Sequence, residues 1–539
     1  MKLSGMLVDV HKKKIYPASV YFENEFITNI ERCDGKVENY ILPGLIDSHV
    51  HIESSMITPG AFAQAAVKHG TTGVVSDPHE IANVMGLEGI EFMISDAKKV
   101  PVNFWFGASS CVPATDFETS GASINSNGIE KLLLRDDIKY LSEMMNFPGV
   151  IYGNKEVLEK INIARRLSKP VDGHAPGLTG EMLKKYVNSG ISTDHECTSL
   201  KEAEEKIFLG MKILIREGSA AKNLDDLKEL FKLNPEMIML CSDDLHPEML
   251  VKGHINKLIA KLVSEDYDIF NVIQSCTVNP VRHYGLDAGL LKQGQPADMI
   301  IVDDCRKMNV LETWIRGRKV FDRGSVLFKY NKGPSINKFN SSEIKPSDIE
   351  VRGKGSKMRV IEASDGSLFT KCIIRSTGSE RIVESNTRED ILKIIVKDRY
   401  TDKPASVGFI KGFGLKEGAI ASSVAHDSHN IISVGANDED IVMAVNEIIR
   451  LKGGLSVAGK GRVTSLKLSI AGIMSDDSCE EVAADYQLLS GEIRSLGCTL
   501  NAPFMTLSFM ALLVIPELKI GDRGLFDVEQ FKLTSLFSD

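Results

Sequence analysis

Residues 43–53, PGLIDSHVHIE, combine a short apolar run with a His-x-His pair at its end. On a β-strand, side chains two residues apart point to the same side, so His49 and His51 can face one site. Imidazole is a common ligand of transition metals, and two imidazoles on one strand can hold a single ion. The segment therefore predicts a buried strand that carries the first part of a metal site.

Seven further apolar runs follow this strand, and helix-like segments such as 59–70, 199–210 and 223–233 lie between most of them. Strands that alternate with helices indicate a parallel sheet, and eight such units in about 240 residues predict a closed (β/α)8 barrel of the TIM type. The eight runs are Leu45–Ile52, Thr72–Asp77, Val102–Ser109, Ile138–Met144, Pro170–His174, Ile191–His195, Lys212–Glu217 and Met237–Asp243.

Polar residues with side chains suited to catalysis, such as Asp, Glu, His and Ser, fall at the carboxyl ends of these runs. They occur in SDPHE, SEMMN, DGHAP, TDHE, REGS and CSDD. In a barrel those ends share one face, where the reactions of such enzymes take place. For any single run, a turn or cap role is the better explanation of these residues. Together with His49 and His51, however, His174, His195 and the pair Asp243/Asp244 favour a metal site.

The segments on either side of the barrel return to a strand-like alternation of apolar and polar residues, before residue 45 and again at 295–304 and 319–328. We expect both flanks, 1–44 and 286–335, to form one small β-domain beside a barrel at 45–285. The polar stretch 331–348 is a plausible linker to a C-terminal α+β domain at 340–539. The predicted class is thus α/β, with two smaller domains attached to the barrel.

Composition excludes several classes of protein. Hydrophobic residues make up 43% and charged residues 25% of the 539 residues, ordinary values for a globular chain. The net charge is −9 and the sequence lacks a long basic run, so the charge does not indicate a surface that binds nucleic acid or an anionic membrane. The first residues lack the apolar core of a signal peptide, and the stretch 504–516 is too short to span a bilayer. Nine cysteines without a CxxC pair suggest reduced thiols, so we expect a cytoplasmic protein.

The ordered motifs resemble a known family. The first strand, the isolated histidines on strands five and six, the aspartate on strand eight and the closing segment 279–303 are similar to those of the amidohydrolase superfamily. Within it, SDPHEIANVMG (76–86), SEMMNFPGVI (142–151), CSDDLHP (241–247) and AHDSHN (425–430) resemble the adenine deaminases. The resemblance extends along nearly the whole chain.

The resemblance implies a binuclear centre of divalent metal. His49, His51 and Asp243 would hold one ion, and His174 and His195 the other. Many relatives bridge the ions with a carboxylated lysine on strand four, but here Glu143 occupies the end of that strand, while Lys139 and Lys155 lie before and after it. The family resemblance suggests Mn²⁺, and the ligand types also suit Fe²⁺ or Zn²⁺.

The implied reaction is the hydrolysis of adenine, the small-molecule substrate, to hypoxanthine and ammonia, with Asp243 transferring the proton. Glu217 is the candidate for the purine edge, with a salt bridge to Arg216 as the alternative. His79 is a further catalytic candidate, while Asp77, Asp244 and Ser109 are expected to bind or orient the substrate. We also expect a homo-oligomer.

Other functions stay open at this point. The chain resembles enzymes that hydrolyse cyclic amides, although these generally need the strand-four lysine; a related 6-substituted purine is a second possible substrate. A catalytically inactive scaffold protein is a further alternative, but such a protein would not need the full set of metal ligands. His426 and His429, far along the chain, could reach the active site, bind another ion or form a structural loop.

Overall fold

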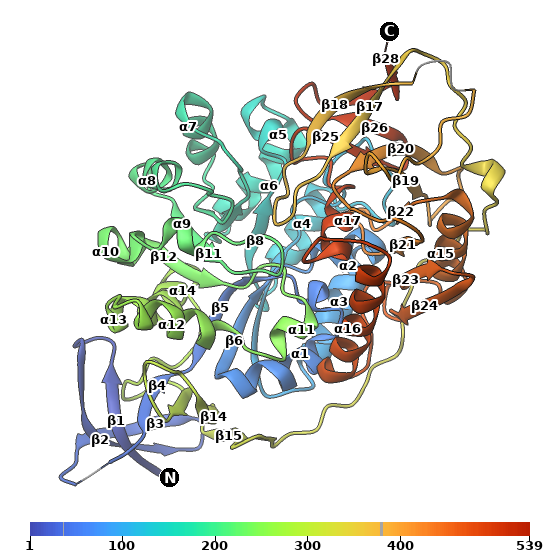
Figure 1. The fold of residues 1–539 in the computed structure, drawn as a ribbon. Helices are drawn as coiled ribbons and strands as arrows, with labels where there is room; N and C mark the ends of the chain where they lie inside the picture. The colour runs from blue at the N-terminus through green and yellow to red at the C-terminus, as the bar shows by residue number, and fades with distance from the viewer. Residues whose placement is uncertain (36, 378–380, 539) are drawn as a thin grey trace.

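The computed structural model describes residues 1–35, 37–377 and 381–538, and its centre is the barrel (Figure 1). The strands pair in parallel within two groups, β5 to β9 and β10 to β12. The ring closes where Asp243 N donates to His49 O at 3.0 Å and, on the other side, where Ser192 N donates to Val171 O at 2.9 Å. The eight predicted strands are confirmed as β5 (Leu45–Val50), β6 (Thr71–Ser76), β7 (Asn103–Ala108), β8 (Ile138–Met144), β9 (Val171–Gly173), β10 (Thr193–Asp194), β11 (Lys212–Arg216) and β12 (Ile238–Cys241).

Helices cover the outside of the ring, and local sequence sets where they begin. The side chains of Asn125, Asn154 and Ser199 each accept a hydrogen bond from the first turn of the helix that follows. The chain order is α1 (Pro59–Ala66), α2 (His79–Met85), α3 (Leu87–Ala97), α4 (Ser126–Leu133), α5 (Phe147–Ile151), α6 (Lys155–Arg166), α7 (Gly180–Asn188), α8 (Leu200–Phe208), α9 (Leu224–Leu227), α10 (Leu230–Leu233), α11 (Pro247–Leu250), α12 (Ile255–Ser264), α13 (Ile269–Ser275) and α14 (Val278–Tyr284).

Both flanks of the barrel contribute to one small sheet, as expected. Its central pair joins β4 to β13 in antiparallel register, so that residues 40–43 lie against residues 299–302. Strand β4 also pairs in parallel with β1. The sheet contains β1 (Lys2–Asp9), β2 (Lys14–Glu23), β3 (Phe26–Arg32), β4 (Tyr40–Pro43), β13 (Met299–Val302), β14 (Val310–Ile315), β15 (Arg318–Asp322) and β16 (Ser325–Val326).

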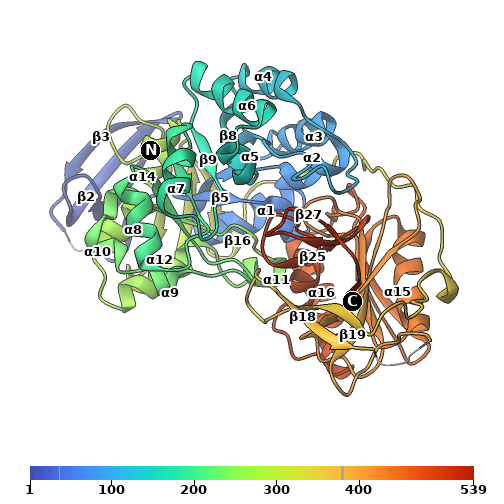
Figure 2. The same ribbon diagram turned by 90° about the horizontal axis from the view of Figure 1, so that it is seen from above.

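The C-terminal domain has a large mixed sheet, mostly antiparallel, with helices packed against it (Figure 2). Its strands are β17 (Lys357–Glu362), β18 (Lys371–Ser376), β19 (Ile391–Lys397), β20 (Ser406–Lys411), β21 (Ala419–Ser422), β22 (Ile431–Gly435), β23 (Gly454–Gly459), β24 (Arg462–Lys467) and β28 (Phe537–Ser538). A smaller sheet contains β25 (Leu518–Gly521), β26 (Gly524–Asp527) and β27 (Lys532–Thr534), and the helices are α15 (Asp438–Leu451), α16 (Cys479–Ser495) and α17 (Pro503–Phe509).

This domain packs on the barrel beside the carboxyl ends of its first strands. Ser475 N donates to Met56 O at 2.7 Å, and Lys68 forms an ion pair with Glu480 of α16. The connecting segment has no regular element between Val326 and the short 3-10 helix Pro346–Asp348. Within the described ranges, no helix has the length and apolarity needed to cross a membrane.

Candidate active site

Six buried side chains at the carboxyl ends of the barrel strands form the centre of the candidate site. His49 and His51 come from β5, and their Nε2 atoms lie 3.4 and 3.3 Å from Oδ1 of Asp243, which follows β12. His174 follows β9 and His195 follows β10, with 3.2 Å between Nδ1 of the first and Nε2 of the second. The barrel thus collects these five residues from the ends of four strands, and Glu143 from a fifth strand, β8, completes the cluster.

Glu143, at the end of β8, joins the two pairs of histidines. Its Oε1 lies 3.4 Å from His51 Nε2, while its Oε2 lies 2.9 Å from His174 Nδ1 and 3.0 Å from His195 Nε2. Burial would raise the pKa of the Glu143 carboxyl, but the imidazoles of His195 and His174 hold that pKa well below its usual range. One ionised carboxylate therefore faces both halves of the cluster.

No lysine lines this cavity in the described parts of the chain. Lys139, the alternative considered for the bridge, lines a groove outside the cavity beside Trp105 and Asp137. Lys155 is exposed at the start of α6. Glu143 is accordingly the bridging group that the geometry favours.

The cluster fits divalent metal ions by its chemistry. Neither ring nitrogen of the fully buried His49 has a hydrogen-bond partner, and the same is true of Nε2 of His174. Buried polar atoms without a partner are rare because their desolvation is costly. The donor set of imidazoles with shared carboxylates suits ions such as Mn²⁺, Fe²⁺ and Zn²⁺. Potential ligand atoms also converge in the groups His49/His195/Asp243 and Glu143/His174/His195.

Asp243 has a special backbone and a charged partner. Its φ of 55° lies in the left-handed region, where aspartate is one of the more tolerated residues. Arg216 donates to its Oδ2 at 2.6 Å and holds Glu196 at 2.6 and 2.8 Å through two nitrogens. Burial would raise the pKa of Asp243, but the Arg216 guanidinium and the neighbouring imidazoles hold it well below its usual range.

Asp243 and Asp244 both line the cavity, although successive residues of a continuing strand would point to opposite sides, because β12 ends at Cys241. The left-handed turn at Asp243 breaks the alternation. Asp244 accepts a hydrogen bond from Ser54 at 2.5 Å, whereas Asp243 faces the histidines.

The C-terminal domain closes the cavity from the other side. Glu80, which follows β6, lies 2.5 Å from Nδ1 of His426, and its second oxygen contacts His429. Burial would lower the pKa of His426, but Glu80 raises it to about 9. Asp427 also borders the cavity, with Leu368, Phe509 and Leu512 as apolar walls.

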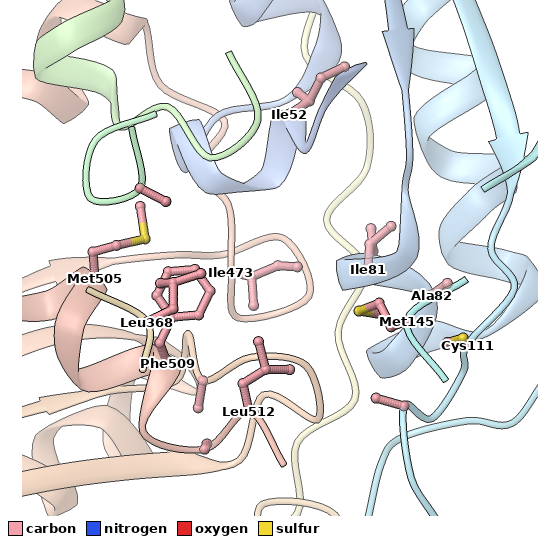
Figure 3. Packing of buried hydrophobic residues seen from close by; sticks show 14 of the residues in the cluster. Ile52, Ile81, Ala82, Cys111, Met145, Leu368, Ile473, Met505, Phe509 and Leu512 are labelled. Atoms are coloured by element: carbon pink, nitrogen blue, oxygen red, sulfur yellow. The ribbon is translucent and has the colours of Figure 1, made fainter. Parts of the chain in front are cut away.

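The apolar side chains of the two domains meet around this cavity. Figure 3 shows Leu368, Phe509 and Leu512 of the C-terminal domain opposite Ile81 and Met145 of the barrel. All belong to one continuous buried cluster. The space enclosed in the cavity is about 20 Å³, far below the hundreds of Å³ typical of ligand pockets.

Comparisons with known proteins agree with this architecture. The model of the amidohydrolase family matches residues 40–320, and the model of the adenine deaminase C-terminal domain matches residues 367–532. An adenine deaminase of Methanosarcina mazei is 51% identical over 100% of both chains. One of Salinibacter ruber is 48% identical over 100% of this chain and 99% of its own, and one of Borreliella burgdorferi is 46% identical over 98% of each.

The chain belongs to the adenine deaminase family of amidohydrolases. Membership of the amidohydrolase family implies a divalent metal centre, which the donor cluster described above fits.

Two expected substrate residues of this adenine deaminase family member lie behind the cavity wall. Asp77 Oδ2 is 3.1 Å from Nδ1 of His79, and Ser109 donates to Asp77 at 3.5 Å. Neither Asp77 nor Ser109 lines the cavity, although Asp77 approaches the same nitrogen of His79 as Glu143 does. His79 itself lines the cavity and approaches Glu143 at 3.5 Å. Asp77 thus contacts His79 and Ser109 contacts Asp77, and a role of either residue toward the substrate stays a prediction.

Glu217, the candidate for the purine edge, does not line the cavity, and its role stays a prediction that the geometry does not favour. Successive residues at a strand end point to opposite sides, and here Arg216 faces the cavity while Glu217 lines a separate groove with Lys222 and Lys261. Desolvation by burial raises the pKa of Glu217, which lies apart from the histidine cluster. Within the segment REGS, the residue at the cavity is Arg216, one position before the predicted Glu217.

Several functional residues were missed by sequence reasoning. Glu196 and Arg216 each adjoin a predicted site residue, so the motifs TDHE and REGS contained the signal. Glu80 lies beside His79 in the motif SDPHE, which contained its signal. In the C-terminal domain, the segment AHDSHN was the only sequence indication of residues at the cavity, and a structural loop was an equal alternative for it.

Proposed function

We propose that this protein hydrolyses adenine to hypoxanthine and ammonia in a site that holds two divalent metal ions. The observation that carries the proposal is the position of Glu143 between His51 on one side and His174 and His195 on the other. A carboxylate shared between two sets of imidazoles is the arrangement that a pair of cations requires. The curated relatives that match the whole chain are adenine deaminases.

In this proposal His49, His51 and Asp243 hold one ion, His174 and His195 hold the other, and Glu143 is shared. When bound, two divalent ions lower the pKa of water and so supply a nucleophile near neutral pH. We propose Mn²⁺ as the ion, with Fe²⁺ or Zn²⁺ as alternatives that the donor types also accept.

The protein's own groups then move the proton. Asp243 takes a proton from the attacking water and delivers it to the amino nitrogen, so that the bond from C6 to this nitrogen breaks and ammonia leaves. Arg216 fixes the carboxylate of Asp243 in place through the 2.6 Å hydrogen bond. His79, oriented by Asp77, and Asp244, held by Ser54, face the substrate side of the cavity.

We also propose a cytoplasmic, homo-oligomeric enzyme. All nine cysteines are free thiols and seven of them are buried, which suits a reducing compartment. Sedimentation of the purified protein tests the oligomeric state.

The direct test uses protein expressed with Mn²⁺ and assayed for ammonia release from adenine, dihydroorotate, a hydantoin and other 6-substituted purines. We expect turnover of adenine, followed by the change in absorbance as hypoxanthine forms. Turnover of a cyclic amide without turnover of adenine would refute the proposal. An inactive protein that binds no metal would indicate a scaffold.

A further inference from the structure

The loop of the C-terminal domain that carries His426 not only covers the cavity but also places a fixed imidazole ring at its wall. His426 is 2% exposed, and its ring lies parallel to that of Phe509, with 4.5 Å between the centroids and 13° between the planes. The Nδ1 of this ring lies 2.5 Å from Oε1 of Glu80. The imidazole is therefore fixed on one face by an aromatic ring and on one edge by a carboxylate.

The opposite edge of the same ring has no partner. The Nε2 atom of His426 is buried without a hydrogen bond, and the residue lines the cavity that also contains the metal-binding cluster. Oδ2 of the neighbouring Asp427 is likewise buried and unpartnered. Because unsatisfied buried groups are costly, such a pair on a cavity wall indicates groups that a ligand completes.

The walls around these atoms suit a flat heterocycle. Leu368, Phe509 and Leu512 provide apolar surfaces from the C-terminal domain, and Met145 provides one from the barrel (Figure 3). A carboxylate that holds one nitrogen of an imidazole leaves the other nitrogen oriented for an incoming partner. The ring nitrogens of a purine are hydrogen-bond acceptors at the edge of such a flat surface.

We propose that His426, oriented by Glu80, donates a hydrogen bond from Nε2 to a ring nitrogen of the substrate. This inference rests on the proposed function and deepens it, because it assigns the recognition of the purine to the C-terminal domain. His426 is then a substrate-binding residue, and Glu80 is a positioning residue that acts through it.

His429 offers a matched control. It lies on the same loop, is 1% exposed and contacts the other oxygen of Glu80, yet it does not line the cavity. Its φ of 53° lies in the left-handed region, which asparagine tolerates, so His429→Asn is the control variant. His426→Phe keeps a ring beside Phe509 but lacks the nitrogen, and His426→Gln is a second variant if the first does not fold.

The experiment uses the full-length, metal-loaded enzyme. KM for adenine and the inhibition constants of 1-deazaadenine, 3-deazaadenine and 7-deazaadenine are measured for the wild type and each variant. We expect His426→Phe to weaken adenine binding roughly 10- to 100-fold, the loss of one hydrogen bond to a charged group. The analogue that lacks the contacted nitrogen should bind both proteins almost equally, whereas the control should change the binding of all compounds by one common factor.

Three results would overturn this proposal while leaving the proposed function intact. The first is that the wild type deaminates adenine while a His426 variant binds every analogue more weakly by the same factor. A uniform loss of binding would indicate a structural role for His426. The second is unchanged adenine binding in both His426 variants. The third is a metal content of three ions per chain that falls to two in His426→Phe, since His426 would then be a metal ligand. A wild type that does not deaminate adenine would instead refute the proposed function.

Discussion

At the scale of single residues, the two neighbouring aspartates have different surroundings and should have different roles. Asp243 faces His49, His51 and Arg216, whereas Asp244 accepts a hydrogen bond from Ser54. Asp243→Asn keeps the shape but removes the base, so we expect kcat to fall about 10²- to 10⁴-fold while metal is largely retained. Asp244→Asn should mainly raise KM. Steady-state kinetics of both variants at several pH values provide the check, and a larger fall in kcat for the Asp244 variant would reverse the assignment.

Glu143 carries the second prediction at this scale. Glu143→Gln replaces an ionised carboxylate by a neutral amide, which is a weaker ligand for two cations, so at least one ion per chain should be lost. Glu248→Gln is the control, because Glu248 is outside the cavity and burial raises its pKa to about 7. Elemental analysis should find two ions in the control. Two ions and a normal rate in Glu143→Gln would show that the bridge lies elsewhere.

At the scale of elements, β25 fixes two segments that form the cavity wall. Lys519 on this strand is fully buried, and its Nζ donates to Leu368 O at 2.7 Å and Phe509 O at 3.1 Å. Both of these residues line the cavity. The lysine thus holds the backbone of two segments of the wall in place.

Burial lowers the pKa of Lys519 from 10.5 to about 7. Between these values the unfolded chain binds more protons than the folded one, so this group makes the protein more stable as pH rises from 7 to 10.5. Lys519→Met removes the contribution. We expect the Tm of the wild type minus that of the variant to increase between pH 7 and pH 9.5 in calorimetric scans. A constant difference would mean that Lys519 stays charged in the folded state.

Sequence patterns predicted the elements that depend on local periodicity. The eight barrel strands and the positions of His49, His174 and His195 follow from apolar runs whose ends share one face. The side that Glu217 faces depends on one residue of register, which a pattern does not resolve. The contact of Glu80 with His426 joins residues that are 346 positions apart, and only packing between domains brings them together.

At the scale of the whole molecule, the candidate metal centre joins five barrel strands beneath the C-terminal domain. Glu143 and Asp243 both lie within 3.4 Å of His51 Nε2 in a buried cluster. Ions that bind only the folded state would stabilise that state by mass action, about 2.7 kcal/mol per site at one hundred times Kd. Removal of metal by a chelator should therefore lower both activity and Tm, and added Mn²⁺ should restore both. An unchanged Tm after complete removal, verified by elemental analysis, would contradict this.

The small sheet built from both flanks has a consequence for the chain during its synthesis. Strand β4 pairs with β1 along one edge, but its other edge has no partner until β13 has been synthesised. Met299 is translated about 250 residues after Pro43, and at roughly 5–20 residues per second the nascent chain carries an open strand edge for about 12–50 s. Unpaired edges recruit other strands. On the ribosome, this interval exposes the growing chain to misassembly with a neighbouring nascent chain, and it ends only when the second half of the sheet emerges.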